Sequence, residues 1–427
     1  MKDLSVLKKL SLLCRVGCLG SSLKYIKSFF GGHNIHLMIS LSLFAPIFAD
    51  DLSSVLSSDR TQLLEYKKGQ NQEQTSKLKD SWINPIQLQY SKSYSTQYSK
   101  TIGLKQFIIS VDQPIFQMGG IWAAMKYASA LGKANELDIE IQKKELISNA
   151  YRLLFNLRKA QLQERKLELL IANDNLDIQI QKESYDAELS NRTLYDQALL
   201  KRNRDVTSKL ETEMSIVSLK NDFSLLSDRK PEYFKLPNFT LMRQSEYEAG
   251  QLKLKRDKLR IEEKKYNYRM IWTKYLPKLS VIGRYVSEDL NPMFASGNLD
   301  QEYYTYGFKV SMLININAKN DIANSKIALL ESKINFDEEH KKVINSYKLV
   351  VKKLEVIDRK IALSQEDATH YQSMLTTTQE LEKLGDKTSF DTQIVANTLQ
   401  VREIDQSIYA IDAQLELLGL YSQIWQP

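Results

Sequence analysis

The side chains that usually carry catalysis or bind metal ions are scarce in this sequence of 427 residues. Beyond residue 49 the histidines are His340 and His370, and both stand in long polar stretches of helix-forming composition. The cysteines are Cys14 and Cys18, so disulfides, thiolate metal sites and a cysteine nucleophile are excluded from residue 19 onward. No glycine-rich phosphate loop and no Ser/His/Asp arrangement is visible. The sequence therefore indicates neither an enzyme nor a cofactor or metal.

Two short motifs place acidic side chains just after turns. Thr193-x-x-Asp196 follows a turn at 190–192, and Thr388-x-x-Asp391 follows Gly385-Asp386-Lys387. A threonine followed three residues later by an acidic residue resembles a capping box, in which each of the two side chains accepts a hydrogen bond from the other residue's backbone N–H. We therefore expect a helix to begin at each motif.

Two segments alternate apolar and polar residues with a period of two, as strands with one apolar face do. We expect one β-hairpin at about 85–116 and a second at about 276–317. The apolar residues of 102–104 are out of phase with those of 107–111, which predicts a bulge near Lys105 and Gln106. Tyrosines near the strand ends match the aromatic girdle of an outer-membrane strand. They are Tyr90, Tyr94, Tyr98, Tyr304 and Tyr306.

Long helices follow the strands. The first is expected at about 121–189 and would be on the order of 100 Å long. Others are expected at about 193–227, 244–273, 322–383 and 390–421, and a polar helical stretch precedes the first hairpin. In the last two, apolar residues recur in alternating steps of three and four, the spacing of antiparallel coiled coils. Helices this long need neighbouring helices for support.

The order helix, two strands, long helix, turn and helix occurs twice, over 50–227 and 244–427, with a connector at 228–243. Phe308 stands 201 residues after Phe107, whereas Thr388 stands 195 residues after Thr193. This drift predicts a few inserted residues in the first long helix. Repetition at a fixed period indicates a stacked or ring-like architecture.

Residues 1–49 form a basic leader that carries five of the seven net positive charges. The remainder has no basic cluster interleaved with aromatic residues, so no nucleic-acid partner is expected. The apolar run at 35–49 is too short to span a bilayer and ends before Asp50-Asp51, which predicts a signal peptide cleaved near Ala49. A translation start near Met38 and lipidation at Cys18 stay open as alternatives.

Four strands cannot close a barrel, and lipid does not tolerate unpaired strand edges. Several chains must therefore combine their strands, and three chains would supply twelve, enough for a polar lumen. The alternative is a soluble antiparallel sheet packed on a core. That alternative lacks a further apolar segment to cover the tyrosine-rich face.

Together these features resemble the TolC family of outer membrane efflux proteins. The resemblance covers Asp50 to Trp425 and rests on the signal peptide, the duplication, Gln113-Pro114-Ile115-Phe116-x-x-Gly119 before the long helix, and Thr-x-x-Asp at both tips. It implies a mainly α fold with a membrane β-barrel contribution. Long antiparallel coiled-coil helices would form an α-barrel, and four strands per chain would complete a 12-stranded barrel in a homotrimer.

The resemblance also implies a location and partners. The channel would lie in the outer membrane of a Gram-negative-type cell, in contact with lipid, and extend into the periplasm. A periplasmic adaptor and an inner-membrane efflux or secretion pump would dock on it. It would be the exit duct of a tripartite efflux or type I secretion system that passively conducts drugs, metals or proteins.

A gate at the periplasmic entrance is implied as well. Asp196 matches the acidic partner after the first turn, Lys387 the basic gate residue, which is usually arginine, and Asp391 the first of two ringing aspartates. Two positions depart from the family, since Ile394 replaces the second aspartate and Glu382 replaces a tyrosine. One acidic ring instead of two weakens the prediction of cation block, although Glu382, Asp386 and Asp391 would keep the entrance acidic. Plain helix capping is the other role open to Asp196 and Asp391.

A rival function is that of a periplasmic or surface coiled-coil scaffold or adaptor without a channel. The two-sided strands argue against it, as does the lack of the compact β-rich domain that an adaptor would carry.

Overall fold

The computed structural model describes residues 52–97, 100–288 and 302–424. The chain divides into two compact units, Met1–Pro46 and Ile47–Pro427, and every described residue lies in the second. The leader predicted at 1–49 and the girdle residue Tyr98 lie outside the described residues.

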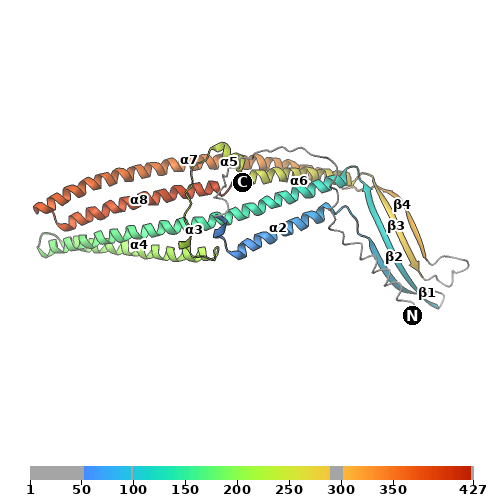
Figure 1. Cartoon of the computed structure of the whole chain (residues 1–427), viewed down its shortest axis with the longest axis horizontal. Helices are drawn as coiled ribbons and strands as arrows, with labels where there is room; N and C mark the ends of the chain where they lie inside the picture. Colours follow the sequence, from blue (N-terminus) through green and yellow to red (C-terminus); the bar gives the residue numbers. More distant parts are fainter. Residues whose placement is uncertain (1–51, 98–99, 289–301, 425–427) are drawn as a thin grey trace, which may run out of the picture. The chain divides into compact units, whose positions relative to one another are not determined.

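Four antiparallel strands form one sheet in the order β1-β2-β3-β4 (Figure 1). They are β1 (Gln87–Gln97), β2 (Lys100–Phe116), β3 (Lys278–Glu288) and β4 (Glu302–Ser311). The bulge predicted near Lys105 and Gln106 is wrong, because the β1–β2 register runs without a shift from Gln87↔Ser110 to Gln97↔Lys100. The register shifts instead between Pro114 and Phe116, where proline has no N–H to donate. The second hairpin is also shorter than expected, since β4 ends at Ser311.

The long helix α3 (Gly120–Asp186) starts directly after β2 and contains 67 residues (Figure 1). It packs against α2 (Ser58–Lys79), α4 (Arg192–Ser224), α6 (Leu252–Lys274) and α8 (Ser389–Tyr421). Small residues allow the close approach, since a Cβ on Gly132 would collide with the Thr75 side chain of α2. Asn71 of α2 also donates to the Gly132 carbonyl oxygen at 2.9 Å. Gly132 is therefore a packing residue and not a helix break.

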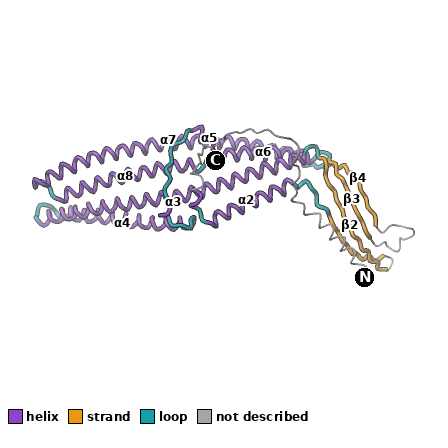
Figure 2. The backbone as a smooth tube through the Cα atoms, viewed as in Figure 1, coloured by secondary structure: helices purple, strands orange, loops and turns teal. Residues whose placement is uncertain are grey.

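Shorter helices meet end to end alongside the two long ones, α3 and α7 (Ala318–Leu384), as Figure 2 shows. Where α2 meets α4, the Ser57 N–H donates to the Leu226 oxygen at 2.8 Å. Where α6 meets α8, the Leu252 N–H donates to the Gln423 oxygen at 3.1 Å. The single helix predicted at 244–273 is wrong, because this second junction divides it into α5 (Gln244–Gly250) and α6.

The hydrophobic core gathers at these two junctions. Val55, Tyr151, Phe155 and Phe223 belong to the cluster at the α2–α4 junction. The cluster at the α6–α8 junction comprises Tyr247, Leu254, Val343, Tyr347, Val350, Leu420 and Ile424. Tyr151 in α3 and Tyr347 in α7 thus occupy corresponding places in the two halves. The insertion predicted in the first long helix is wrong, since α3 and α7 have 67 residues each.

The coiled-coil spacing predicted for α7 and α8 is confirmed by their packing. Val343, Tyr347, Val350 and Ile357 of α7 are buried at the predicted steps. Val401, Ile408 and Leu418 of α8 are buried likewise. The mainly helical fold with four strands per chain is therefore confirmed, while closure of the strands and helices in a homotrimer stays a prediction.

The turn after α7 offers a test of backbone strain. Gly385 has φ 84°, and nothing lies within 4 Å of a Cβ built on it. Gly385→Ala should therefore cost about 1 kcal/mol of local stability through the left-handed backbone alone. Hydrogen exchange of the Asp386 amide, which donates to the Leu381 oxygen at 2.9 Å, should become about fivefold faster.

Gly69→Ala is the matched control, because Gly69 lies inside α2 in ordinary helical backbone and a Cβ there also meets nothing within 4 Å. Exchange in α2 should be unchanged or slower, since alanine favours a helix over glycine. Equal acceleration in both variants would contradict the assignment of strain to Gly385.

Candidate functional site: two sheet faces and two helix turns

The four-stranded sheet has one aromatic and one largely polar face, because residues paired across antiparallel strands share a face. Tyr90 pairs with Phe107, Ile109 with Tyr285, and Tyr285 with Tyr304. The predicted girdle residues within the described chain lie on this aromatic face. Their exposed fractions are 67% for Tyr90, 66% for Tyr94, 76% for Tyr304 and 81% for Tyr306. Phe308 and Val310 extend the face along β4 with 75% and 73% exposed.

The opposite face carries serines, glutamines and charged residues. Lys309 of β4 pairs with Asp112 of β2 at 2.7 Å, and Gln106 donates to Glu288 Oε2 at 2.6 Å. The same face includes the buried apolar side chains of Ile108 and Val286. Polar groups thus pair with each other on this face, whereas the aromatic face presents large apolar surface without a covering element among the described residues.

The sheet has two free edges. Within the described residues, β1 pairs only with β2, and β4 pairs only with β3. Each edge strand therefore presents backbone N–H and C=O groups that another strand could pair with. No helix among the described residues is long and apolar enough to cross a membrane.

The two helix turns differ in their capping. At the second turn the predicted capping box is confirmed: Thr388 Oγ1 accepts from the Asp391 N–H at 3.3 Å, and Asp391 Oδ2 accepts from the Thr388 N–H at 3.0 Å. The capping box predicted at Thr193 is wrong, because α4 begins at Arg192 and Thr193 therefore already lies inside the helix. Asn191 caps it instead, and its Oδ1 accepts from the Leu194 N–H at 3.3 Å. Arg192, now inside the helix, pairs with Asp196 at 3.5 Å.

The predicted gate residues gather within each turn and not across the two turns. Lys387 lies 3.9 Å from Asp391, and the Glu382 carbonyl accepts from the Gly385 N–H at 3.0 Å. Asp386 is exposed next to them. The backbone N–H and hydroxyl of Thr388, with Lys387, lower the pKa of Asp391. No hydrogen bond or ion pair joins Asp196 to this group in the described part of the chain.

Sequence reasoning missed a polar seam where α3 packs on α8. Lys159 pairs with Asp412 at 2.6 Å, Lys166 with Asp405 at 2.6 Å, and Asn173 lies 3.3 Å from Thr398. We call these three pairs the α3–α8 seam. On each helix its members recur every seventh residue, so the two antiparallel helices match in register. The heptad spacing is visible in the sequence, but the pairing is not, because the partners are separated by more than 200 residues. Ile394, predicted at the gate, lies at the end of this seam, where its carbonyl accepts from Asn173 Nδ2 at 3.4 Å.

A second missed feature is a buried carboxylate between α3 and α4. Asp174 is 1% exposed, and its Oδ1 accepts from Lys201 Nζ at 2.7 Å. The hydrogen bond to Asp174 raises the pKa of Lys201. Burial and the adjacent Asp174 raise the pKa of Asp205. No group of three or more His, Cys, Asp or Glu residues in the described chain could hold a metal ion.

Solved structures share this arrangement of strands and helices. The outer membrane protein VceC of Vibrio cholerae aligns with a TM-score of 0.70 and 13% identity, over 88% of this chain and 95% of that one. The CmeC outer membrane channel of Campylobacter jejuni aligns with a TM-score of 0.68 and 14% identity, over 87% of this chain and 84% of that one. The open-state MtrE outer membrane channel of Neisseria gonorrhoeae aligns with a TM-score of 0.63 and 12% identity, over 88% of this chain and 89% of that one.

The chain has the TolC fold. The resemblance inferred from the sequence is thereby confirmed at the level of fold. No protein-family profile and no curated protein matches the sequence. The TolC fold is thus carried here by strand pairing and helix packing at very low sequence identity.

The α3–α8 seam can be tested by removing one partner. Asp405 is 5% exposed, so Lys166→Met leaves a buried carboxylate whose remaining ion-pair partner among the described residues is Arg402, at 3.4 Å. We expect the free energy of unfolding to fall by about 2–3 kcal/mol, measured by denaturant titration followed by circular dichroism. The double variant Lys166→Met/Asp405→Leu should recover most of the loss.

The control is Lys352→Met, which breaks the exposed Lys352–Glu355 pair on α7. It should change stability by less than about 0.5 kcal/mol, because both side chains remain hydrated. A loss in Lys166→Met no larger than that of the control would show that the buried Asp405 carboxylate does not depend on Lys166.

Proposed function

We propose that the chain is one subunit of a homotrimeric outer membrane channel-tunnel. The observation that carries the proposal is the sheet, which has an exposed aromatic face, a polar face with its own ion pair, and two unpaired edges. Lipid would cover the aromatic face, and water would fill the space lined by the polar face. Pairing β1 of one subunit with β4 of the next would satisfy the free backbone groups, as a closed barrel requires.

The helical layer supports the same association. Within the described chain α4 packs on α3, α3 on α8 and α8 on α7, so α4 and α7 are the outer members. Both carry exposed apolar side chains along their length. On α4 these include Leu200, Leu210, Met214 and Val217, and on α7 Leu349, Val356 and Leu363. Such rows suit packing against another copy of the chain, which would close the helices into a tunnel.

A tunnel of this kind would serve as the exit duct for a pump that lies elsewhere. We infer a periplasmic adaptor and an inner-membrane efflux or secretion pump as partners, and passive conduction of their cargo across the periplasm and outer membrane. The helix turns, which lie about 100 Å of helix away from the strands, would form the periplasmic entrance.

Thr305 and Phe308 lie on opposite faces of β4, so a charge placed at each position tests which sheet face meets lipid. Phe308→Arg places a charge on the aromatic face and should cost about 2–4 kcal/mol of membrane stability, so trimer yield in detergent and channel activity in planar bilayers should fall sharply. Thr305→Arg places the same charge on the polar face and should leave trimers intact while changing ion selectivity.

The coiled-coil scaffold makes the opposite prediction. If the unmodified protein were soluble without detergent, formed no three-fold particles and produced no conductance, the channel proposal would fail. Equal tolerance of Phe308→Arg and Thr305→Arg would argue against lipid on the aromatic face.

The role of Asp391 at the entrance can be separated from its role as a cap. Asp391→Asn removes the charge and should reduce block by multivalent cations about tenfold or more. Thr388→Ala removes the cap but keeps the carboxylate, so it should destabilise α8 by about 1 kcal/mol and retain the cation block.

Because Thr388 and Lys387 lower the pKa of Asp391, the cation block should persist as the pH falls to about 4 and be lost below the folded-state pKa. Single-channel recordings with unchanged cation sensitivity in Asp391→Asn would remove Asp391 from the gate.

A further inference from the structure

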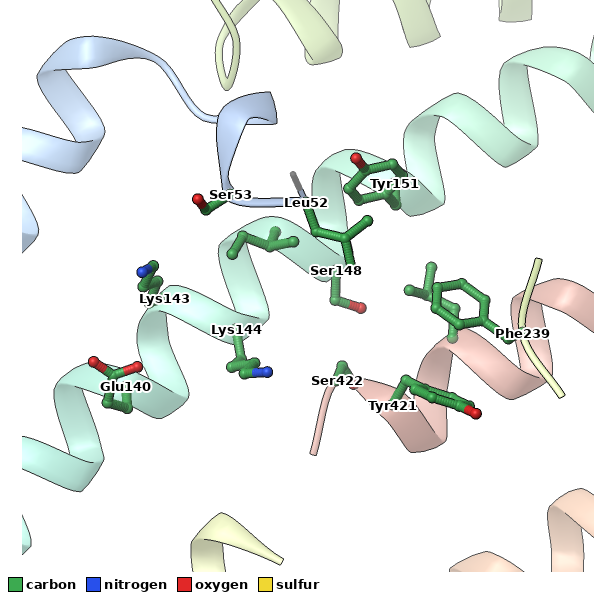
Figure 3. Close-up of a pocket in the computed structure, with 12 residues that line it drawn as sticks. Leu52, Ser53, Glu140, Lys143, Lys144, Ser148, Tyr151, Phe239, Tyr421 and Ser422 are labelled. Atoms are coloured by element: carbon green, nitrogen blue, oxygen red, sulfur yellow. The ribbon is translucent and has the colours of Figure 1, made fainter. Parts of the chain in front are cut away.

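A cavity of ≈ 210 Å³ lies beside the α2–α4 junction, far along the chain from both the strands and the helix turns. Its walls come from the 3-10 helix at Leu52–Val55, the middle of α3, the connector near Phe239 and the last turn of α8 (Figure 3). Nothing in the proposed channel function uses this site.

One wall of the cavity is aromatic and held in place. The rings of Phe239 and Tyr421 lie 4.8 Å apart between centroids. Gln414 fixes the backbone of Phe239 on both sides: its Oε1 accepts from the Phe239 N–H at 2.7 Å, and its Nε2 donates to the Phe239 oxygen at 3.2 Å. Tyr421 Oη donates to the Thr240 oxygen at 3.0 Å. This wall is therefore built without a ligand and needs little reordering to receive one.

The α3 wall presents a buried hydroxyl with no partner. Ser148 is 4% exposed, and its Oγ is buried without a hydrogen bond to any described residue. A helical serine or threonine commonly donates to the carbonyl four residues earlier, as Thr376 does to Gln372 at 3.1 Å in α7. Ser148 does not, although an unsatisfied buried hydroxyl costs free energy. The Ser148 hydroxyl is therefore a free donor, and an acceptor atom of a ligand in the cavity could satisfy it.

Lys144 stands one helical turn before Ser148 and lines the same cavity. In Figure 3 both side chains lie on the side of α3 that faces Tyr421 of α8 and the next residue, Ser422. No hydrogen bond or ion pair of the Lys144 ammonium is observed among the described residues, and burial lowers its pKa. Glu140 and Lys143 are the neighbouring charges, and they act on Lys144 in opposite directions. The cavity thus has two adjacent hydrogen-bond donors, one of them cationic, beside an aromatic wall.

We propose that this cavity binds a small monocarboxylate with an apolar body, of about the size of benzoate. The carboxylate would accept hydrogen bonds from Lys144 and Ser148, and the ring would pack on Phe239 and Tyr421. A dry cavity of about 150 Å³ holds benzene, so ≈ 210 Å³ leaves room for a ring and one carboxylate. A dianion or a longer chain is disfavoured, because the Glu140 carboxylate also lines the cavity and little further space remains.

The test is calorimetric titration of the purified full-length protein in detergent with benzoate, and with neutral benzamide as the isosteric comparison. Benzoate should bind, and benzamide should bind at least tenfold more weakly. Ser148→Ala should lower the affinity for benzoate about tenfold, which corresponds to one hydrogen bond to a charged group. The same variant should raise the thermal midpoint of the free protein, because an unsatisfied buried hydroxyl is removed.

Lys144→Met keeps the length of the side chain and should abolish the preference for benzoate over benzamide. Lys182→Met, at an exposed position near the end of α3, is the matched control and should bind as the unmodified protein does. Absence of benzoate binding, equal affinity for benzamide, or undiminished affinity in Lys144→Met would overturn the proposal. Because none of these outcomes involves conductance or trimers, the result is independent of the channel proposal.

Discussion

A helix of 67 residues is stable only when neighbours cover it along its whole length, and this requirement organises the helical part of the molecule. Isolated helices gain little from propensity, and most of their stability comes from packing. Here α3 is covered by two end-to-end pairs of shorter helices, α2 with α4 and α6 with α8, and α7 is covered by the second pair. The breaks fall beside Tyr151 and Tyr347, where an uninterrupted helix and a hydrophobic cluster span them. Continuity in one helix thus compensates for the break in its neighbour.

The strand region depends on a different constraint, the pairing of backbone groups. A fixed antiparallel register places Tyr90, Phe107, Tyr285 and Tyr304 on one face and leaves Asp112 and Lys309 on the other. The inner strands satisfy their N–H and C=O groups on both sides, while β1 and β4 do so on one side in the described chain. A sheet that is amphipathic and open at both edges is incomplete as a single subunit, which is why the proposed assembly follows from the sheet more directly than from the helices.

Between α3 and α8 the contact is polar where a simple coiled coil would place leucine. Pairing a buried carboxylate such as Asp405 with Lys166 adds little net stability, because desolvation offsets most of the attraction. It does make other registers costly, since a slip of one turn would leave the carboxylate buried without its partner. The α3–α8 seam therefore mainly fixes the register in which α3 packs on α8. This register also sets the relative position of the two helix turns at the end of the seam.

The local pattern determined the element types, because period-two alternation, heptad spacing and the Thr388–Asp391 capping box depend on residues close in sequence. It misplaced features that depend on contacts between distant segments. The break at Gln251 exists because α8 ends there, and the β1–β2 register stays regular although its apolar pattern shifts, since ladder hydrogen bonds outweigh side-chain phase. At the first turn, Asn191 caps the helix in place of Thr193, and sequence alone does not rank these two candidates, which stand two residues apart.

The candidate sites divide in the same way. The sequence by itself determined the repeat, the aromatic strand face and the charged turns, since each is written in neighbouring residues. Only the tertiary structure decided that Lys166 meets Asp405, that Asp174 is buried beside Lys201, and that Ser148 and Lys144 line one cavity with Phe239 and Tyr421. Those residues come from segments up to 277 positions apart, and their meeting is set by how the long helices pack.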